Sequence, residues 1–335
     1  MKYDMPKGYN SKLSLIETEI AIKELKDVFE RELAKKLSLI RVSAPLFVRP
    51  ETGLNDNLNG IERPVSFDVK DIGGGVVEIV QSLAKWKRMA LARYGFKEGE
   101  GLYTDMNAIR RDEDLGNMHS IYVDQWDWEK IISKEDRNEE MLKDTVSKIY
   151  EALKETEKKI NSDFQTLSFK LPDKITYMTT QELEDRYPDM TPKQREDDIT
   201  RQAGAVFLMK IGKVLRSGEM HDGRAPDYDD WELNGDILLY NELLDRSFEI
   251  SSMGIRVDEI SLNKQIEIRN CKERLNMPFH RMILNSELPY TIGGGIGQSR
   301  LCMYFLEKAH VGEVQSSVWS EVMIEECRGK GIFLL

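Results

Sequence analysis

The stretch YTIGGGIGQSR, residues 290 to 300, places four glycines between Gly293 and Gly297 and an arginine, Arg300, three positions later. A glycine run suggests phosphate binding, but the spacing fits neither of the two best-known glycine loops. A P-loop requires G-x-x-x-x-G-K-[ST], which occurs nowhere in the chain. A dinucleotide fingerprint requires G-x-G-x-x-G, and counting from Gly293 or Gly295 puts Gln298 or Arg300 at its third glycine.

Two interpretations of this segment remain. Glycine has no Cβ, so the run can let a flat ligand or another chain segment approach the backbone, with Arg300 in the first turns of a following helix. Alternatively, the run is only a helix start packed tightly on a sheet. The apolar residues from position 301 to 306 predict a helix in both cases.

Composition limits the class of protein. The 335 residues carry 48 Lys and Arg against 59 Asp and Glu, a net charge of −11, which disfavours nucleic acid as a partner. Three cysteines without C-x-x-C spacing argue against a disulfide framework and a zinc site and predict a reducing, cytoplasmic location. The start, MKYDMPKGYN, lacks the apolar core of a signal peptide, and no stretch is apolar enough to span a membrane. No linker or repeat divides the chain, so we expect one domain, 1–335.

Hydrophobic periodicity predicts two long amphipathic helices, Leu13–Leu37, with Ile16 and Ile20 on its apolar face, and about 139–160. The strand-like run from Leu39 to Val48 contains Pro45, which suits a sheet edge or an interface. Other expected elements are a hairpin at 65–80, a helix from 83, strands at 205–211, 235–240 and 248–257, and then helix to about Asn285. This order favours an α+β fold with an antiparallel β-sheet flanked by helices.

Polar side chains gather in the segment from Arg110 to Glu129. Its arginines can clamp phosphate or carboxylate groups, although a solvated loop with surface ion pairs is the plainer alternative. The alternating row Asp124, Trp126 and Trp128 looks like a pocket lining.

A second polar stretch, HDGRAPDYDDW, covers residues 221–231 and lacks the spacing of a calcium loop. Asp236 and Glu249 lie on separate strand-like runs, where two carboxylates could share a magnesium ion that carries the phosphates of a nucleotide. The four histidines are too scattered to form a metal cluster.

The order of these segments resembles the catalytic core of class II aminoacyl-tRNA synthetases. The strand with Pro45 is similar to motif 1, RRDEDLGNMHSIYVDQWDWE (110–129) to motif 2 of the aspartyl and asparaginyl enzymes, FEISSMGIRV (248–257) to a strand of the same subgroup, and GGGIGQSRL to motif 3. The resemblance implies that the glycines make room beside adenine and that Arg300 meets the nucleotide.

Over nearly the whole chain the resemblance is closer to the ammonia-dependent asparagine synthetases, which share that fold. Eight segments carry it: NDNLNG (55–60), SLAKWKR (82–88), GEGLYT (99–104), HSIYVDQWDWE (119–129), HDGRAPDYDDW (221–231), LNGDIL (233–238), SSMGIR (251–256) and TIGGGIGQSRL (291–301). Gln81 stands where the family pattern has histidine, and Arg111 where it has proline. Either Arg110 or Arg111 can therefore play the motif 2 role, and we favour Arg110.

This resemblance implies that aspartate's side-chain carboxylate attacks the α-phosphorus of MgATP, giving β-aspartyl-AMP and pyrophosphate, and that ammonia then displaces AMP. The implied site residues fall into four groups. Catalytic roles go to Asp56, Lys87, Arg110, Asp229 and Arg300; aspartate binding to Asp56, Lys87, Gln125, Asp127, Arg224, Ser251 and Ser252; nucleotide binding to Arg110, His119, Asp236, Gly295, Gly297 and Arg300; and magnesium binding to Asp236 and Glu249. Asp56 or Asp229 accepts the ammonium proton. The resemblance also implies a homodimer.

Three other functions compete with this one. An aspartyl- or asparaginyl-tRNA synthetase would share motifs 2 and 3, but the chain opens with a helix in place of an anticodon-binding barrel and is acidic. A catalytically silent amino-acid sensor would lose the arginines and metal carboxylates, which are present. A glutamine-dependent amidotransferase with an N-terminal nucleophile would need cysteine after Met1, where Lys2 stands.

Overall fold

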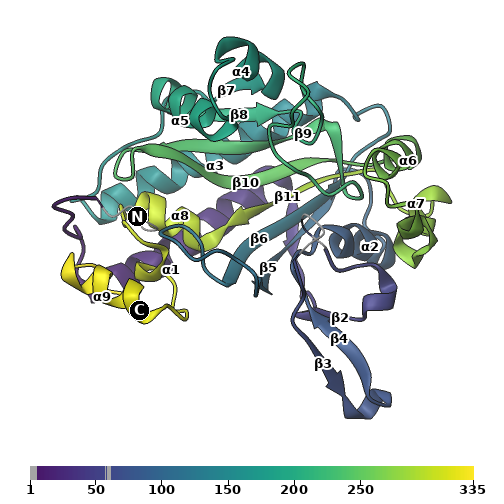
Figure 1. The fold of residues 1–335 in the computed structure, drawn as a ribbon, viewed down its shortest axis with the longest axis horizontal. Coiled ribbons are helices and arrows are strands. Elements are labelled where there is room, and N and C mark those ends of the chain that lie inside the picture. Colours follow the sequence, from purple (N-terminus) through teal and green to yellow (C-terminus); the bar gives the residue numbers. More distant parts are fainter. Residues whose placement is uncertain (1–5, 57, 59–61) are drawn as a thin grey trace.

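The computed structural model of the protein describes residues 6–56, 58 and 62–335, and its core is an eight-stranded sheet (Figure 1). The strand order is β1-β5-β6-β11-β10-β9-β8-β7. The outermost pairs, β1 with β5 and β7 with β8, are parallel, and the five inner pairings are antiparallel. The strands are β1 (Leu39–Arg41), β5 (Gly101–Ile109), β6 (Tyr122–Ile131), β7 (Thr176–Thr179), β8 (Ala205–Met209), β9 (Asp229–Asn241), β10 (Arg246–Arg256) and β11 (Thr291–Gly297).

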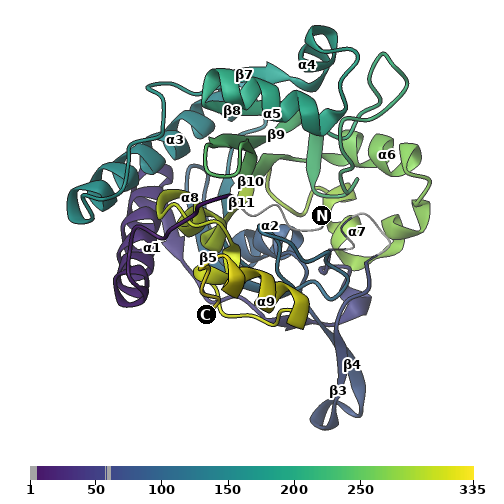
Figure 2. The same cartoon turned by 60° about the vertical axis from the view of Figure 1, so that its left-hand side comes forward.

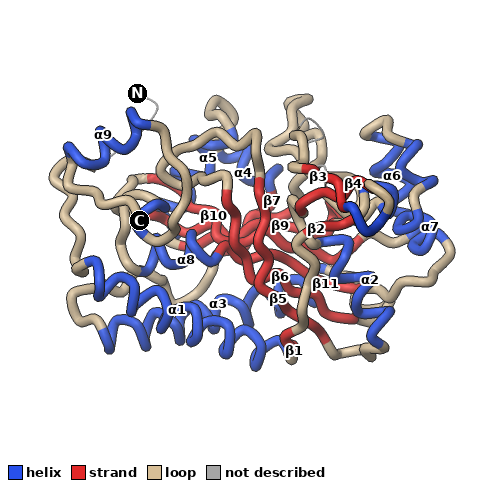
Figure 3. The backbone as a smooth tube through the Cα atoms, turned by 90° about the horizontal axis from the view of Figure 1, so that it is seen from below, coloured by secondary structure: helices blue, strands red, loops and turns tan. Residues whose placement is uncertain are grey.

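One face of this sheet carries the largest hydrophobic core. The helices α1 (Leu15–Leu37) and α3 (Glu139–Asp163) run side by side along it (Figure 3), together with α8 (Gln298–Phe305). The other face is covered only at its two ends. At one end lie α2 (Ala84–Tyr94), α6 (Glu259–Ile268) and α7 (Pro278–Leu284), and at the other lie α4 (Thr180–Arg186) and α5 (Pro192–Ala203). The middle of this second face is left for a site.

The helix α1 begins where its sequence provides a cap. Ser14 accepts a hydrogen bond from the backbone N–H of Glu17, whose carboxylate accepts one in return from Ser14 N. The buried face contains Ala21, Leu25 and Phe29 among others. Our placement of Ile16 and Ile20 on that face is wrong, since they are 69% and 53% exposed. Ile20 stands about 100° around the helix from Ala21, so the two point in different directions.

Two other sequence predictions need correction. The helix expected to run to Asn285 is broken into α6, a 3-10 turn at Lys272–Asn276 and α7, which starts with Pro278 at its first position. Pro45 lies outside regular strand, in the link between β1 and β2 (Phe47–Val48). A proline there removes no ladder hydrogen bond from a neighbouring strand.

The hairpin predicted for residues 65–80 is confirmed as β3 (Ser66–Val69) and β4 (Gly75–Ile79). Gly73 and Gly74, with φ of 72° and 77°, turn the chain between them. With β2 they form a three-stranded sheet that projects from the body of the molecule (Figures 1 and 2). The short helix α9 (Glu321–Gly329) completes the fold. In the part of the chain that the structure describes, no helix is long and apolar enough to cross a bilayer.

Candidate active site

A cavity of about 860 Å³ opens in the uncovered middle of the second sheet face. Its walls come from β6, β10 and β11, the start of α2, the loop after β5 and the 221–229 loop. Of the site residues expected from the sequence, all but one line it, namely Asp56, Lys87, Arg110, His119, Gln125, Asp127, Arg224, Asp229, Glu249, Ser251, Ser252, Gly295, Gly297 and Arg300. The exception is Asp236, which lies behind Arg224.

Asp124, the first residue of the expected row on strand β6, lines the cavity as predicted. Gln125 and Asp127 line the cavity, whereas Trp126 and Trp128 are fully buried in the core on the opposite face. The ring of Trp126 lies 4.8 Å from that of Phe29 in α1. The interpretation of the tryptophans as pocket lining is therefore wrong. Side chains alternate between the faces of a strand, and the wide tryptophan rings fill the core.

The glycine run forms the strand β11, at the centre of the sheet, and not a loop. A Cβ on Gly295 would overlap the amide of Gln125, and one on Gly293 would overlap the carboxylate of Glu129 and lie 2.6 Å from Arg256 Nη2. These glycines make room for polar side chains that reach across from β6 and β10. The interpretation that the glycines let another chain segment approach the backbone is confirmed, since side chains of the neighbouring strands lie against them, and Arg300 lies in the helix that follows.

A buried group of alternating charges lies along this strand. Lys87 donates to the carbonyl of Gly294 at 2.8 Å, and its Nζ lies 3.4 Å from Asp127 Oδ1. Burial lowers the pKa of Lys87, and Asp127 partly offsets that effect. Arg256 pairs with Glu129 at 2.7 Å and also with Asp229. Burial raises the pKa of Asp229, while Arg256 acts against the rise.

Two arginines, Arg110 and Arg300, line the cavity. Arg300 Nη1 donates to the carbonyl of Glu249 at 2.9 Å, and its Nη2 donates to His119 Nε2 at 2.8 Å. Burial, with Arg300 and Arg110 nearby, lowers the pKa of His119 to about 4, so near neutral pH this imidazole is uncharged and can accept that bond. Arg110 lines the cavity, whereas Arg111 is exposed and lies outside it. This placement favours Arg110 for the motif 2 role.

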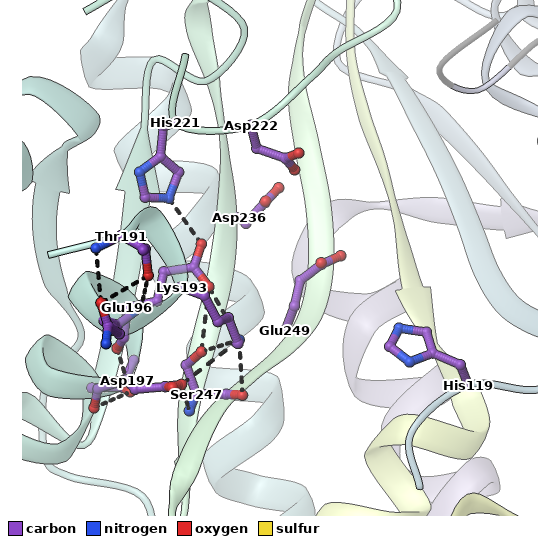
Figure 4. Close-up of polar contacts among 12 residues, drawn as sticks. His119, Thr191, Lys193, Glu196, Asp197, His221, Asp222, Asp236, Ser247 and Glu249 are labelled. Carbon is purple, nitrogen blue, oxygen red and sulfur yellow. Dashed lines mark hydrogen bonds and ion pairs between the residues drawn. The ribbon is translucent and has the colours of Figure 1, made fainter. Parts of the chain in front are cut away.

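The candidate magnesium carboxylates lie on neighbouring strands, β9 and β10. Asp236 pairs with Arg224, and its Oδ1 has no hydrogen-bond partner among the described residues. Burial raises the pKa of Asp236, Arg224 opposes the rise, and Glu249 adds to it. Figure 4 shows Asp222, Asp236 and Glu249 beside one another. Within the described ranges no three such side chains form a ready metal cage, but Mg²⁺ typically takes only one or two carboxylates besides phosphate and water. The residues therefore fit a magnesium ion that arrives with a nucleotide.

Sequence reasoning missed three residues of the site, Glu129, Tyr228 and Arg256. Tyr228 lines the cavity, and burial raises the pKa of its phenol well above its usual value, so it stays protonated. Glu129 and Arg256 lie inside quoted motifs, Arg256 next to apolar strand residues and Glu129 in a strand that carries other charges as well. A buried charge needs a partner of opposite sign, so a charge next to apolar strand residues was a usable signal for Arg256. In the NDNLNG segment, Asn57, Asn59 and Gly60 lie outside the described residues.

Solved structures show what fold this is. The structure is similar to asparaginyl-tRNA synthetase from Pyrococcus horikoshii complexed with asparaginyl-adenylate, with a TM-score of 0.65 at 13% identity over 89% of this chain and 68% of that one. For the enzyme from Entamoeba histolytica, also with asparaginyl-adenylate, the TM-score is 0.64 at 13% identity, over 90% of this chain and 66% of that one. The predicted class II synthetase-like fold is confirmed, and the chain spans about two thirds of the length of these synthetases.

Sequence relatives give the family. The aspartate-ammonia ligase from Clostridium tetani is 68% identical over 99% of this chain and 97% of its own length. Those from Fusobacterium nucleatum and Ruminiclostridium cellulolyticum are 64% and 63% identical, each over 98% of this chain and 100% and 98% of their own lengths. The family model described as aspartate-ammonia ligase matches residues 16–331. With its class II fold and a cavity lined by the expected polar residues, this chain belongs to the aspartate-ammonia ligase family.

Proposed function

We propose that this chain is a cytoplasmic, homodimeric ligase of one domain that makes L-asparagine from L-aspartate, ATP and ammonia. The reaction passes through β-aspartyl-AMP and releases pyrophosphate and then AMP. The observation that carries the proposal is a set of buried polar atoms in the cavity wall that lack hydrogen-bond partners among the described residues, namely Asp56 Oδ2, Arg110 Nε, Asp127 Oδ2 and Ser251 Oγ. Buried polar groups normally have partners, so the wall is prepared for a polar ligand.

In the first step a carboxylate approaches a polyphosphate, and the site must reduce the repulsion between them. Arg110 and Arg300 supply positive charge in the cavity wall, where they would contact the α-phosphate. His119 accepts a hydrogen bond from Arg300 and so fixes the direction of its guanidinium group. Asp236 and Glu249 would hold Mg²⁺, which supplies Lewis-acid charge on the phosphate oxygens when bound.

The same wall offers a matching set of groups for aspartate. Lys87 is a buried cation in the cavity wall and would bind a carboxylate of the amino acid, while Asp127 accepts from its ammonium group. Gln125, Ser251 and Ser252 add neutral hydrogen bonds, and Arg224 adds a second cation. Burial of the aspartate together with these groups strengthens each contact, because few waters compete for it.

In the second step ammonium must lose a proton before nitrogen can attack. Asp56 and Asp229 both line the cavity and are buried, and burial raises the pKa of both. A carboxylate with a raised pKa is a better proton acceptor while it is ionised. Either residue can therefore hold ammonium and take its proton.

The nitrogen donor tests this function. Asparagine should form with ammonium and not with glutamine, because none of the three cysteines lines the cavity, where a thiol would have to attack glutamine. At fixed total ammonium the rate should rise with pH, since free NH3 is the attacking species, until ammonia saturates or a site group titrates. Asparagine measured by chromatography would show both effects. Equal rates with glutamine, in an assay free of glutaminase, would remove the donor assignment.

Exposed apolar side chains around the motif 1 segment support the proposed homodimer. Ile40 in β1 is 62% exposed, and Leu46 and Phe47, on either side of the β2 boundary, are also exposed. The strand β1, at one edge of the main sheet, is only three residues long and contains Ile40. Phe47 lies in β2 of the small sheet, and Leu46 directly precedes it. Light scattering at micromolar concentration should give twice the mass of the 38.8 kDa chain. A fully active monomer would contradict this assembly.

A further inference from the structure

The two candidate proton acceptors come from segments far apart in the sequence. Asp56 follows the 3-10 turn Pro50–Thr52, and Asp229 is the first residue of β9. One side chain from a third element contacts both segments. Lys85, in the first turn of α2, donates from Nζ to the carbonyl of Asn55 at 3.2 Å and pairs with Asp227 Oδ2 at 2.9 Å. It therefore joins the residue before Asp56 to the residue two positions before Asp229.

Asp227 is a firm anchor for this bridge. It is fully buried, and its Oδ2 also meets His280 Nε2 of α7 at 2.8 Å and Arg274 Nη1 at 3.3 Å. Burial alone would raise the pKa of Asp227, but Lys85, His280 and Arg274 together hold it far below its usual range. Asp227 thus stays ionised at any pH at which an enzyme works.

Contacts from α6 and β10 also hold the segment around Asp229. Gln265 of α6 donates from Nε2 to the carbonyls of Pro226 and Asp229, at 3.0 and 2.9 Å, and its Oε1 accepts from Trp231 N at 2.9 Å. Asp229 itself pairs with Arg256. The Asp229 segment is therefore fixed without Lys85, whereas Lys85 is one of the groups that hold the Asp56 segment.

The contacts that hold the Asp56 segment are made by Asn55 and Asp56. Gln81 donates to Asn55 Oδ1 from its backbone N at 2.9 Å and to the carbonyl of Asp56 from Nε2 at 3.2 Å. Asn55 Nδ2 also donates to Glu78 Oε2 at 3.0 Å and to the carbonyl of Ile79 at 3.3 Å. Lys85 adds a cation to these contacts, and it is itself buried, at 3% exposure. Lys85 does not line the cavity, so it would act on a substrate only through the segments that it holds.

Lys85 also sets the charge around Asp56. Burial raises the pKa of the Asp56 carboxyl, Lys85 is the strongest influence that lowers it, and Asp227 raises it. Removing the lysine would leave two buried carboxylates near each other without the cation between them, which favours a protonated Asp56.

We propose that Lys85, anchored on Asp227, is a positioning residue for the ammonia half-reaction, because it sets the place of Asp56 relative to Asp229 and so builds a pocket for a small hydrogen-bonding cation, ammonium. This inference rests on the proposed function, in which one of the two carboxylates accepts the ammonium proton. It assigns Lys85 no part in adenylation, for which the proposed arginines are Arg110 and Arg300 in the cavity wall.

The test separates the two half-reactions. Aspartate-dependent exchange of labelled pyrophosphate into ATP, without ammonium, reports adenylation, and the KM for ammonium reports the second step. In Lys85→Met the exchange rate at saturating aspartate should stay within about threefold of the starting protein, while the KM for ammonium rises about 10- to 100-fold, the scale for a misplaced reacting group.

Controls distinguish this role from loss of stability. Lys308→Met removes an equally buried lysine, bonded to Ser11 and Thr18, and should leave the KM for ammonium unchanged. Lys85→Met combined with Asp227→Asn leaves no buried carboxylate without its lysine and keeps an amide oxygen that can accept from His280 and Arg274. Circular dichroism of both variants checks that they fold, and the double variant should show the same rise in KM.

Two results would overturn the inference: an exchange rate that falls as far as overall turnover, or a KM for ammonium within threefold of the starting value in a folded Lys85 variant. Absence of aspartate-dependent exchange in the unaltered protein would instead reject the proposed function itself.

Discussion

Replacing Arg300 by alanine is expected to lower kcat/KM for ATP by about 10²–10³-fold, the usual scale when one charged donor to a transition state is removed. The guanidinium group is held by the Glu249 carbonyl and by His119, so it is oriented before a nucleotide binds. Without this guanidinium group, less positive charge offsets the repulsion between the carboxylate of aspartate and the phosphates of ATP. Steady-state kinetics with ATP varied at saturating aspartate and ammonium would measure the effect.

The chain offers a matched control for this change. Arg111 is an exposed arginine next to Arg110 and lies outside the cavity wall. Arg111→Ala should stay within about threefold of the starting kcat/KM, as expected for a surface charge, whereas Arg110→Ala should resemble Arg300→Ala. A severe effect of Arg111→Ala with a mild one of Arg110→Ala would reverse our choice of motif 2 arginine.

Replacing Gly293 by alanine is expected to be equally severe, although only one methyl group is added. That Cβ would overlap the Glu129 carboxylate and lie 2.6 Å from Arg256 Nη2, inside a fully buried ion pair. Breaking such a pair costs about 3–5 kcal/mol of unfolding free energy. Because Arg256 also holds Asp229, turnover should fall at least about 100-fold.

Urea unfolding and ammonium-dependent turnover would test the Gly293 prediction together. Gly116→Ala is the control, because a Cβ there has no atom within 4 Å, and it should change neither measurement appreciably. If Gly293→Ala folds and turns over like the starting protein, then room for the Glu129 and Arg256 pair is not the reason for glycine at this position.

The sequence predicted the architecture well because the long helices and the inner strands have strong hydrophobic periodicity. It could not assign faces reliably. Trp126 and Gln125 are adjacent in β6, and which of them faces the cavity depends on the helices that pack on each side. Likewise, Ile16 and Ile20 fit a helical spacing, but burial on α1 follows Ala21, Leu25 and Phe29.

Site residues that lie in a recognised sequence motif could be predicted. Pairs of residues that meet only because distant segments pack together could not. The residues expected in the cavity wall, apart from Asp236, lie there, although their individual roles stay predictions. The pairing of Asp236 with Arg224 was not visible, because a loop and a strand meet only in the fold. Lys85 and Asp227 were in quoted segments, yet nothing in the sequence pairs them across 142 positions.

The most direct test of the account is a product analysis with aspartate, MgATP and ammonium, with tRNA omitted. We predict asparagine, AMP and pyrophosphate in equal amounts, because in the proposed function aspartate is activated as β-aspartyl-AMP beside Arg110 and Arg300. ADP and phosphate would indicate an acyl-phosphate route and remove the basis for the roles of both arginines. Failure to form asparagine without tRNA would contradict the ligase function itself.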